Sequence, residues 1–275
     1  EMRPKLKAFM ADLCWIENIG ARGFAALAKK APTPTIAEIY RYFHAEEQRH
    51  ANAELALMKR WGMLEDSDNP EMPEPNVNIR LAMDWLDRYA DDMSLSVLGT
   101  VIPMLEVALD GALLKFLLEE VDDPVCHQVF EKINNDESRH LAVDFDVLEI
   151  IGHAQARKLA IDFIGTVATP GFIIGMMMYA PLLNRVRNEM VDMGLKPERL
   201  YAAMERFTTV GERGEYTKRV PTYQILKVHA RMVINPKHPY HLLANSMVWV
   251  SDRYPRKLLS PIPSWFKELT YKTAA

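Results

Sequence analysis

The sequence predicts an all-α protein. Apolar residues return every three or four positions through most of the 275 residues, whereas the alternation and β-branched runs typical of strands are scarce. Because 49% of the residues are hydrophobic, the chain can bury a substantial core. Prolines separate the periodic stretches and would end the helices between them. We therefore expect four long helices before residue 153 and further helices after it.

The first predicted helix presents one apolar face and ends at Pro32 and Pro34, which cannot continue a helix. Thr35 followed by Glu38 has the pattern of a capping box. We therefore expect the second helix to begin there and to reach about Trp61. The apolar face of the first helix is formed by Phe9, Leu13, Ile16, Gly20, Phe24 and Leu27.

A polar, proline-rich connection follows the second helix and predicts a surface loop. A short helix is expected at about residues 79–89, and a long one at about residues 95–121. Asp123 followed by Pro124 is typical of a helix start, so a fourth long helix should run from there to about residue 152. The prolines of the connection are Pro70, Pro73 and Pro75.

Residues 1–152 are expected to form one bundle, and residues 153–275 a helical extension packed on it within the same globule. Prolines divide this extension into shorter helices. The tail after Pro255, with Pro261 and Pro263, should lie irregularly on the surface. The earlier prolines of the extension are Pro170, Pro181, Pro197, Pro221, Pro236 and Pro239.

Composition excludes several classes of function. The formal net charge is −4 and no basic stripe is present, so nucleic acid is not an expected partner. The two cysteines, Cys14 and Cys126, have no partner at metal-ligand spacing, which argues against a disulfide framework and a zinc finger. The first 30 residues lack the uninterrupted apolar core of a signal peptide. A cytoplasmic protein is therefore expected.

One segment suggests a membrane or an apolar ligand. Residues 163–183 hold no charged side chain, and a run of this length could span a bilayer. Its internal prolines and glycines would break a continuous span, so we expect a buried helix or a surface that contacts lipid peripherally. The segment, with Met176, Met177 and Met178, could also line an apolar tunnel, although such a stripe is more often plain core.

The pattern Glu-x-x-His occurs twice and is the strongest indication of a metal site in the sequence. Each copy is preceded by an acid, has arginine before the histidine, and follows an acid on the apolar face of the preceding helix by 30 or 31 residues. Residues three apart project from one face of a helix, so a carboxylate and an imidazole can reach one ion or two adjacent ions. The expected metal ligands are Glu17, Glu47, His50, Glu106, Glu137 and His140.

The residue types indicate which metals are suitable. Carboxylates with some imidazole suit iron or manganese, and the absence of nearby thiolates argues against structural zinc. We expect two iron ions, with a manganese–iron or a di-manganese pair as alternatives. Glu17 and Glu106 lie on apolar helix faces, where an unpaired carboxylate would cost several kcal/mol, so a role in metal binding is favoured for both.

Further acids surround the expected ligands. Glu46 and Asp136 are placed to accept a hydrogen bond from the metal-bound histidine of the opposite helix pair, or to pair with Arg49 and Arg139. Tyr40 is a candidate redox tyrosine near the cavity. Pro103 should bend its helix next to a ligand, most simply without consequence. The acids four residues after a ligand are Glu54, Asp110 and Asp144.

The segments AEEQRHA (45–51) and NDESRHLA (135–142), each after a helical glutamate, resemble the ferritin-like di-iron carboxylate superfamily. They are most similar to soluble acyl-carrier-protein desaturases and, more loosely, to the small subunit of ribonucleotide reductase and related oxidases. The resemblance covers roughly residues 5–152. It implies a ferritin-like four-helix bundle with additional C-terminal helices, in which a reduced di-iron pair reacts with dioxygen and attacks a substrate C–H bond.

In the same resemblance, Glu17, Glu47 and His50 hold one iron, and Glu106, Glu137 and His140 hold the other, with one or more bridging carboxylates. The implied substrate is a hydrophobic small molecule or an acyl chain, the implied partner is an electron donor protein or reductase, and a homodimer is expected. The catalytic residues beyond the metal ligands are unknown.

Three alternatives stay open. HLAVDFDV (140–147) resembles a helical family of predicted metal-dependent hydrolases, but Glu54 stands where that family would have a histidine. A ferritin-like iron-storage protein is less favoured because of the long helical extension. A bundle whose buried acids have only a structural role is the third alternative.

Overall fold

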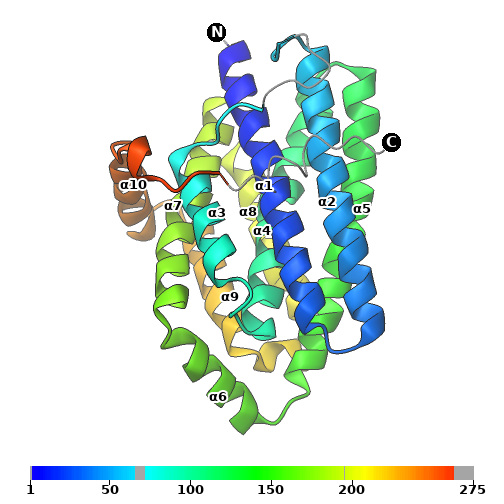
Figure 1. Cartoon of the computed structure of the whole chain (residues 1–275), viewed down its shortest axis with the longest axis vertical. Helices are drawn as coiled ribbons and strands as arrows, with labels where there is room; N and C mark the ends of the chain where they lie inside the picture. Colours follow the sequence, from blue (N-terminus) through cyan, green and yellow to red (C-terminus); the bar gives the residue numbers. More distant parts are fainter. Residues whose placement is uncertain (1, 66–71, 195, 263–275) are drawn as a thin grey trace.

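The computed structural model describes residues 2–65, 72–194 and 196–262, and every regular element in those ranges is helical (Figure 1). The all-α prediction is confirmed. Pro70 and Pro263 lie outside the described residues. In chain order the elements are α1 (Met2–Lys30), α2 (Pro34–Arg60), α3 (Val77–Tyr89), α4 (Leu95–Glu120), α5 (Pro124–Gly152), α6 (Ala156–Val167), α7 (Pro170–Asp192), α8 (Pro197–Gly211), η1 (Thr217–Arg219), α9 (Pro221–Ile234), α10 (Tyr240–Ser251) and η2 (Arg256–Leu258).

The start of α2 corrects one prediction. Its N-cap is Thr33, whose hydroxyl accepts a hydrogen bond from the backbone N–H of Ile36 at 3.2 Å. The expected capping box at Thr35 and Glu38 is wrong, because the fixed φ of Pro34 suits the first helical position and the helix begins earlier. Glu38 instead forms an ion pair with Arg41.

Four long helices enclose the interior that contains the buried acids. α1 packs along α2, and α4 packs along α5, and the two pairs meet through contacts of α1 with α4 and of α2 with α5 (Figure 1). The linkers between the members of each pair are short, so the paired helices run antiparallel. α4 continues helically through Pro103, three residues before Glu106. This arrangement brings one face of each helix toward a common centre.

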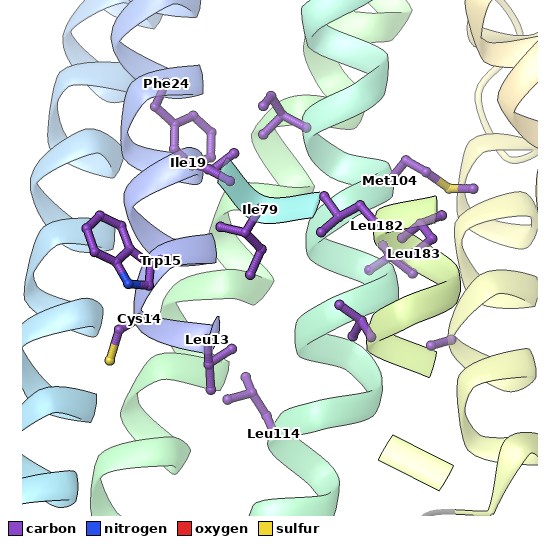
Figure 2. Packing of buried hydrophobic residues seen from close by; sticks show 14 of the residues in the cluster. Leu13, Cys14, Trp15, Ile19, Phe24, Ile79, Met104, Leu114, Leu182 and Leu183 are labelled. Atoms are coloured by element: carbon purple, nitrogen blue, oxygen red, sulfur yellow. The ribbon is translucent and has the colours of Figure 1, made fainter. Parts of the chain in front are cut away.

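The helices after residue 153 cover one side of these four. α8 and α9 pack on α4, α7 packs on α3, and α10 packs on α7. Figure 2 shows apolar side chains from both parts meeting in one layer, among them Ile19 of α1, Ile79 of α3 and Leu182 of α7. Pro170, Pro197 and Pro221 occupy the first turns of α7, α8 and α9, and Pro239 is the N-cap of α10. These four prolines therefore begin helices, whereas α7 continues through Pro181, so the expected division of the chain at Pro181 is wrong.

The uncharged run 163–183 is divided between the end of α6 and the first half of α7. In the part of the chain that the structure describes, no single helix is long and apolar enough to cross a membrane. α6 and α7 meet the combined requirements of length and hydropathy only when taken together, and the chain bends by 72° between them. Ile164 and Ile173 are more than half exposed, whereas Leu182 and Leu183 are buried.

Candidate metal centre

Six side chains from four helices meet in the interior. α1 supplies Glu17, α2 supplies Glu47 and His50, α4 supplies Glu106, and α5 supplies the last two, which are three residues apart on one face. None is more than 6% exposed, although charged side chains are almost never buried without a partner. All six candidate ligands are brought together: Glu17, Glu47, His50, Glu106, Glu137 and His140.

These residues form two overlapping groups, each able to hold a metal ion. Glu17 and His50 belong to one group, and Glu106 and His140 belong to the other, whereas Glu47 and Glu137 belong to both. Within each group, one ligand atom from every residue lies within 4.8 Å of the others. The sequence left open which carboxylates would bridge the two positions. The geometry makes Glu47 and Glu137 the two shared carboxylates.

Both imidazoles present the same ring nitrogen to the centre. Nδ1 of His50 lies 3.1 Å from Oε1 of Glu137 and 3.5 Å from Oε2 of Glu17. Nδ1 of His140 lies 3.2 Å from Oε1 of Glu47 and 3.3 Å from Oε2 of Glu137. Each Nε2 therefore points away from the centre and is available to a second partner.

The outer nitrogens meet carboxylates of the opposite helix pair. Nε2 of His50 lies 3.1 Å from Oδ2 of Asp136, and Nε2 of His140 lies 3.0 Å from Oε2 of Glu46. Arg139 contacts the same two acids at 2.8 Å each. The two arrangements expected for these acids, contact with histidine and pairing with arginine, therefore occur together. Such contacts fix the orientation of an imidazole and raise its basicity as a ligand.

Many polar atoms of the cluster are buried without a hydrogen-bond partner. They include both side-chain oxygens of Glu106 and Glu137, Oε1 of Glu17 and Glu47, and Nδ1 of both histidines. Native proteins rarely leave buried polar atoms unpaired, and a site for an ion is one of the usual reasons. Two divalent cations would also neutralise the charge of the four carboxylates. The donor atoms present therefore fit a pair of metal ions.

The pKa values of the buried glutamates reflect the cost of burying several negative charges close together. Burial, together with the charge of neighbouring acids, raises the pKa of Glu47 and of Glu106 well above the usual range. Burial also acts to raise the pKa of Glu137, but the adjacent imidazoles of His140 and His50 outweigh it and lower the value to about 2. In the absence of cations the cluster therefore retains protons, which metal ions would displace.

Gly20 makes room for one shared carboxylate. A Cβ atom at this position would lie 2.3 Å from Oε2 of Glu47, which is closer than real contacts allow. The sequence places Gly20 three residues after Glu17, and a glycine inside a helix usually has a packing or functional reason. Its role depends on the neighbouring helix α2, so helical periodicity alone could not identify it.

Two further buried acids extend the cluster along α2 and α5. Asp144 accepts a hydrogen bond from the hydroxyl of Tyr40 at 2.9 Å, and burial raises the pKa of Asp144 to about 7. Glu54 is fully buried beside Cys14 and Glu17, and burial followed by the charge of Glu17 raises its pKa. The side chain of Asp110, the third acid of this kind, lies outside the described residues.

Apolar groups pack against part of the centre. Phe24 and Phe43 pack against the ring of His140, with centroid distances of 5.1 and 4.1 Å. A small cavity of about 30 Å³ touches Glu17, Glu47 and Glu106. Its other walls are glycine and aliphatic side chains, namely Ile16, Ile19, Gly20, Ile102, Leu105 and Leu182.

No protein-family model and no curated protein sequence matches the chain. The geometry of the buried cluster and the helices that hold it are therefore the basis for inferring its function. They define a helical protein in which two groups of carboxylate and imidazole ligands can each hold a metal ion.

Proposed function

We propose that the protein is a di-iron carboxylate oxidoreductase with a ferritin-like bundle. It would act as an oxygenase, desaturase or oxidase that uses dioxygen to oxidise a hydrophobic small molecule or an acyl chain. One observation carries the proposal: two buried ligand groups share Glu47 and Glu137 and take one histidine each. A glutamate from each of two helices and Glu-x-x-His from each of two others is the ligand set of di-iron and di-manganese carboxylate proteins.

The ligand chemistry supports iron. All the donor atoms are oxygen or imidazole nitrogen, which suits iron or manganese, and the buried Cys14 belongs to neither ligand group. Iron held in this way supplies redox chemistry with dioxygen that protein side chains cannot perform. Reduction of the iron requires an electron donor, which we assign to a separate protein or reductase.

Each ligand has a distinct role in this proposal. Glu47 and Glu137 would be held in common by the two metal positions, and Glu17 and Glu106 would each belong to one of them. Asp136 and Glu46 hold the imidazoles in orientation through the outer Nε2 atoms. Phe24 and Phe43 keep water from His140, so the centre remains in a medium of low dielectric constant.

The surroundings of the centre support a hydrophobic substrate. An apolar cavity of about 60 Å³ lies next to the small cavity at Glu17. The two cavities share four lining residues, so the apolar cavity lies beside the carboxylates, on the other side of these side chains. The shared residues are Ile19, Ile102, Leu105 and Leu182. Apolar pockets with a few convergent polar groups are the usual binding sites of small molecules.

Oxygen consumption tests the proposal. Iron-loaded protein that has been reduced anaerobically should consume dioxygen when it is mixed with aerated buffer. Glu137→Ala should abolish this reaction because it removes a ligand from both metal positions. Glu131→Ala, at an exposed position on the same helix, is the matched control and should react like the unaltered protein. Equal rates for Glu137→Ala and Glu131→Ala would refute the assignment.

Two other results would also contradict it. Turnover of an ester or amide under strict anaerobiosis, without reductant, would indicate a metal-dependent hydrolase. A large hollow assembly on size-exclusion chromatography that accumulates iron would indicate storage. The di-iron oxidoreductase requires neither.

A further inference from the structure

A groove of about 340 Å³ opens at the surface between α3, α7 and the segment after α10. Trp85 and Met178 line this groove and also line the inner apolar cavity. The inner cavity in turn shares residues such as Leu182 with the small cavity at Glu17. The groove, the apolar cavity and the small cavity are therefore neighbours, and shared side chains form the wall between each one and the next.

We propose that these three spaces are the access route of a linear alkyl substrate, with Met178 as the gate and Trp85 as its fixed side. The inference rests on the proposed function, because it concerns the substrate of the same centre. It adds the path by which the substrate reaches the centre, the linear shape of the substrate and the residue that controls its entry.

Trp85 is held firmly in its position. Its Nε1–H donates a hydrogen bond to the backbone oxygen of Gly171 at 2.6 Å. Gly175 allows the indole to lie against α7, since a Cβ atom there would be 2.3 Å from Cζ2 of Trp85. Both glycines belong to the uncharged run 163–183, whose small residues thus accommodate the aromatic side chains of α3.

Met178 has the properties of a movable side chain. It follows Gly175 by three residues and precedes Leu182 by four, so all three lie on the face of α7 that lines the cavity. Methionine is unbranched and has three rotatable bonds, which lets it change shape at low cost. The preceding residue, Met177, is 53% exposed and lines neither the cavity nor the groove.

The lining of the route determines which ligand fits. The walls of the inner cavity are aliphatic and aromatic, apart from the indole N–H that Gly171 already satisfies. A polar group placed there would lose its hydrogen bonds to water without replacement. The groove, in contrast, has Asp84, Arg88 and Ser260 among its walls. The polar end of the ligand therefore stays in the groove, and the distal end of the alkyl chain reaches the carboxylates.

Calorimetric titration with the neutral 1-alkanols from hexanol to dodecanol tests the route in iron-loaded protein. Affinity should rise about fourfold with each methylene that enters apolar space. Met178→Phe replaces the flexible side chain with a rigid ring and should weaken binding of the longer alcohols at least tenfold. Met177→Phe, the same substitution at the exposed neighbour, should leave binding unchanged.

A second variant tests the route independently, in case Met178→Phe does not fold. Met178→Ala removes the gate, and stopped-flow measurements should show faster association of decanol than in the unaltered protein. Iron content should remain at two per chain in every variant, because none alters a ligand. Equal alkanol affinity in Met178→Phe and Met177→Phe, with iron bound, would overturn the route alone. Absence of bound iron in the unaltered protein would instead overturn the proposed function.

Discussion

Gly20 determines whether Glu47 can extend toward the centre. Alanine at this position would place a methyl group 2.3 Å from Oε2 of Glu47 and displace a carboxylate shared by both ligand groups. We expect Gly20→Ala to bind fewer than two metal ions per chain. Inductively coupled plasma mass spectrometry of the metal-loaded protein measures this number.

Gly165→Ala is the matched control for that substitution. Gly165 also lies within a helix, but among the described residues no atom outside its own helical backbone and chain neighbours lies within 4 Å of the position of its Cβ. Alanine favours helix formation by about 1 kcal/mol relative to glycine, so the control should retain its metal and become slightly more stable. Full metal content in Gly20→Ala would show that Glu47 is not needed in its present position.

Asp136 contacts the imidazole of His50, and in the proposed centre it would act on the metal through that ring. Replacing it by asparagine keeps the shape but removes the charge that accepts from Nε2. Loss of such a contact typically lowers metal affinity by about 10- to 100-fold. Competition with a chelator of known affinity would measure the change in Asp136→Asn. Asp146→Asn, on the same helix but exposed, should show no loss.

The identities of the six candidate ligands were predictable because helical spacing determines which side chains share a face. Which of the carboxylates belong to both ligand groups was not predictable, because this depends on distances between helices. Glu47 and Glu137 became the shared pair only once α2 and α5 were in contact. Contacts such as Tyr40 with Asp144 join positions 104 residues apart, and no local pattern encodes them.

The start of α2 provides a test of helix capping. Thr33 accepts from the N–H of Ile36, whereas Thr35 lies inside the helix. Thr33→Ala should therefore lower the free energy of unfolding by about 1 kcal/mol, as is typical for loss of an N-cap. Thr35→Ala should have a much smaller effect. Urea denaturation of the two variants distinguishes them, and a larger loss for Thr35→Ala would favour the capping box instead.

Helices with strong periodicity and proline boundaries were predicted within a few residues. α4 and α5 begin at the expected positions, and Asp123 with Pro124 marks the start of α5 locally. The uncharged run 163–183 was harder to interpret, since buried and exposed apolar residues look alike in sequence. In the structure it turns between α6 and α7, and alternate faces of α7 contact the cavity and the solvent.

Stability of the whole molecule should depend on pH in the absence of metal. Burial raises the pKa of Glu47 and Glu106 well above 4.5, so the folded chain holds protons that the unfolded chain releases. The free energy of unfolding of metal-free protein should therefore fall as the pH rises from about 5 to about 8. Asp144, whose pKa burial raises from 3.8 to about 7, contributes in the same direction.

Differential scanning calorimetry with and without a chelator measures this dependence. Bound cations replace the protons, so the metal-loaded protein should lose less stability over the same range of pH. The gap in Tm between the two forms should widen as the pH rises. A Tm of the metal-free protein that increases between about pH 5 and pH 8 would contradict the assignment of raised pKa values.

The core of the molecule continues from the four long helices into the later ones. Met104 of α4, Phe207 of α8 and Tyr223 of α9 belong to the same buried cluster. Helical periodicity predicted that the later helices are amphipathic, but it could not predict their partners. α7 lies beside the centre because it packs against residues that are more than 60 positions away in the sequence. Local sequence patterns do not encode such packing.

Anomalous diffraction from crystals of the iron-loaded protein tests the two-metal centre most directly. Two iron peaks of similar height should lie about 3.5 to 4 Å apart, with Glu47 and Glu137 between them. His50 should bind one ion and His140 the other, each through Nδ1. A single peak, or no peak at the six buried ligands when iron is in excess, would contradict the account.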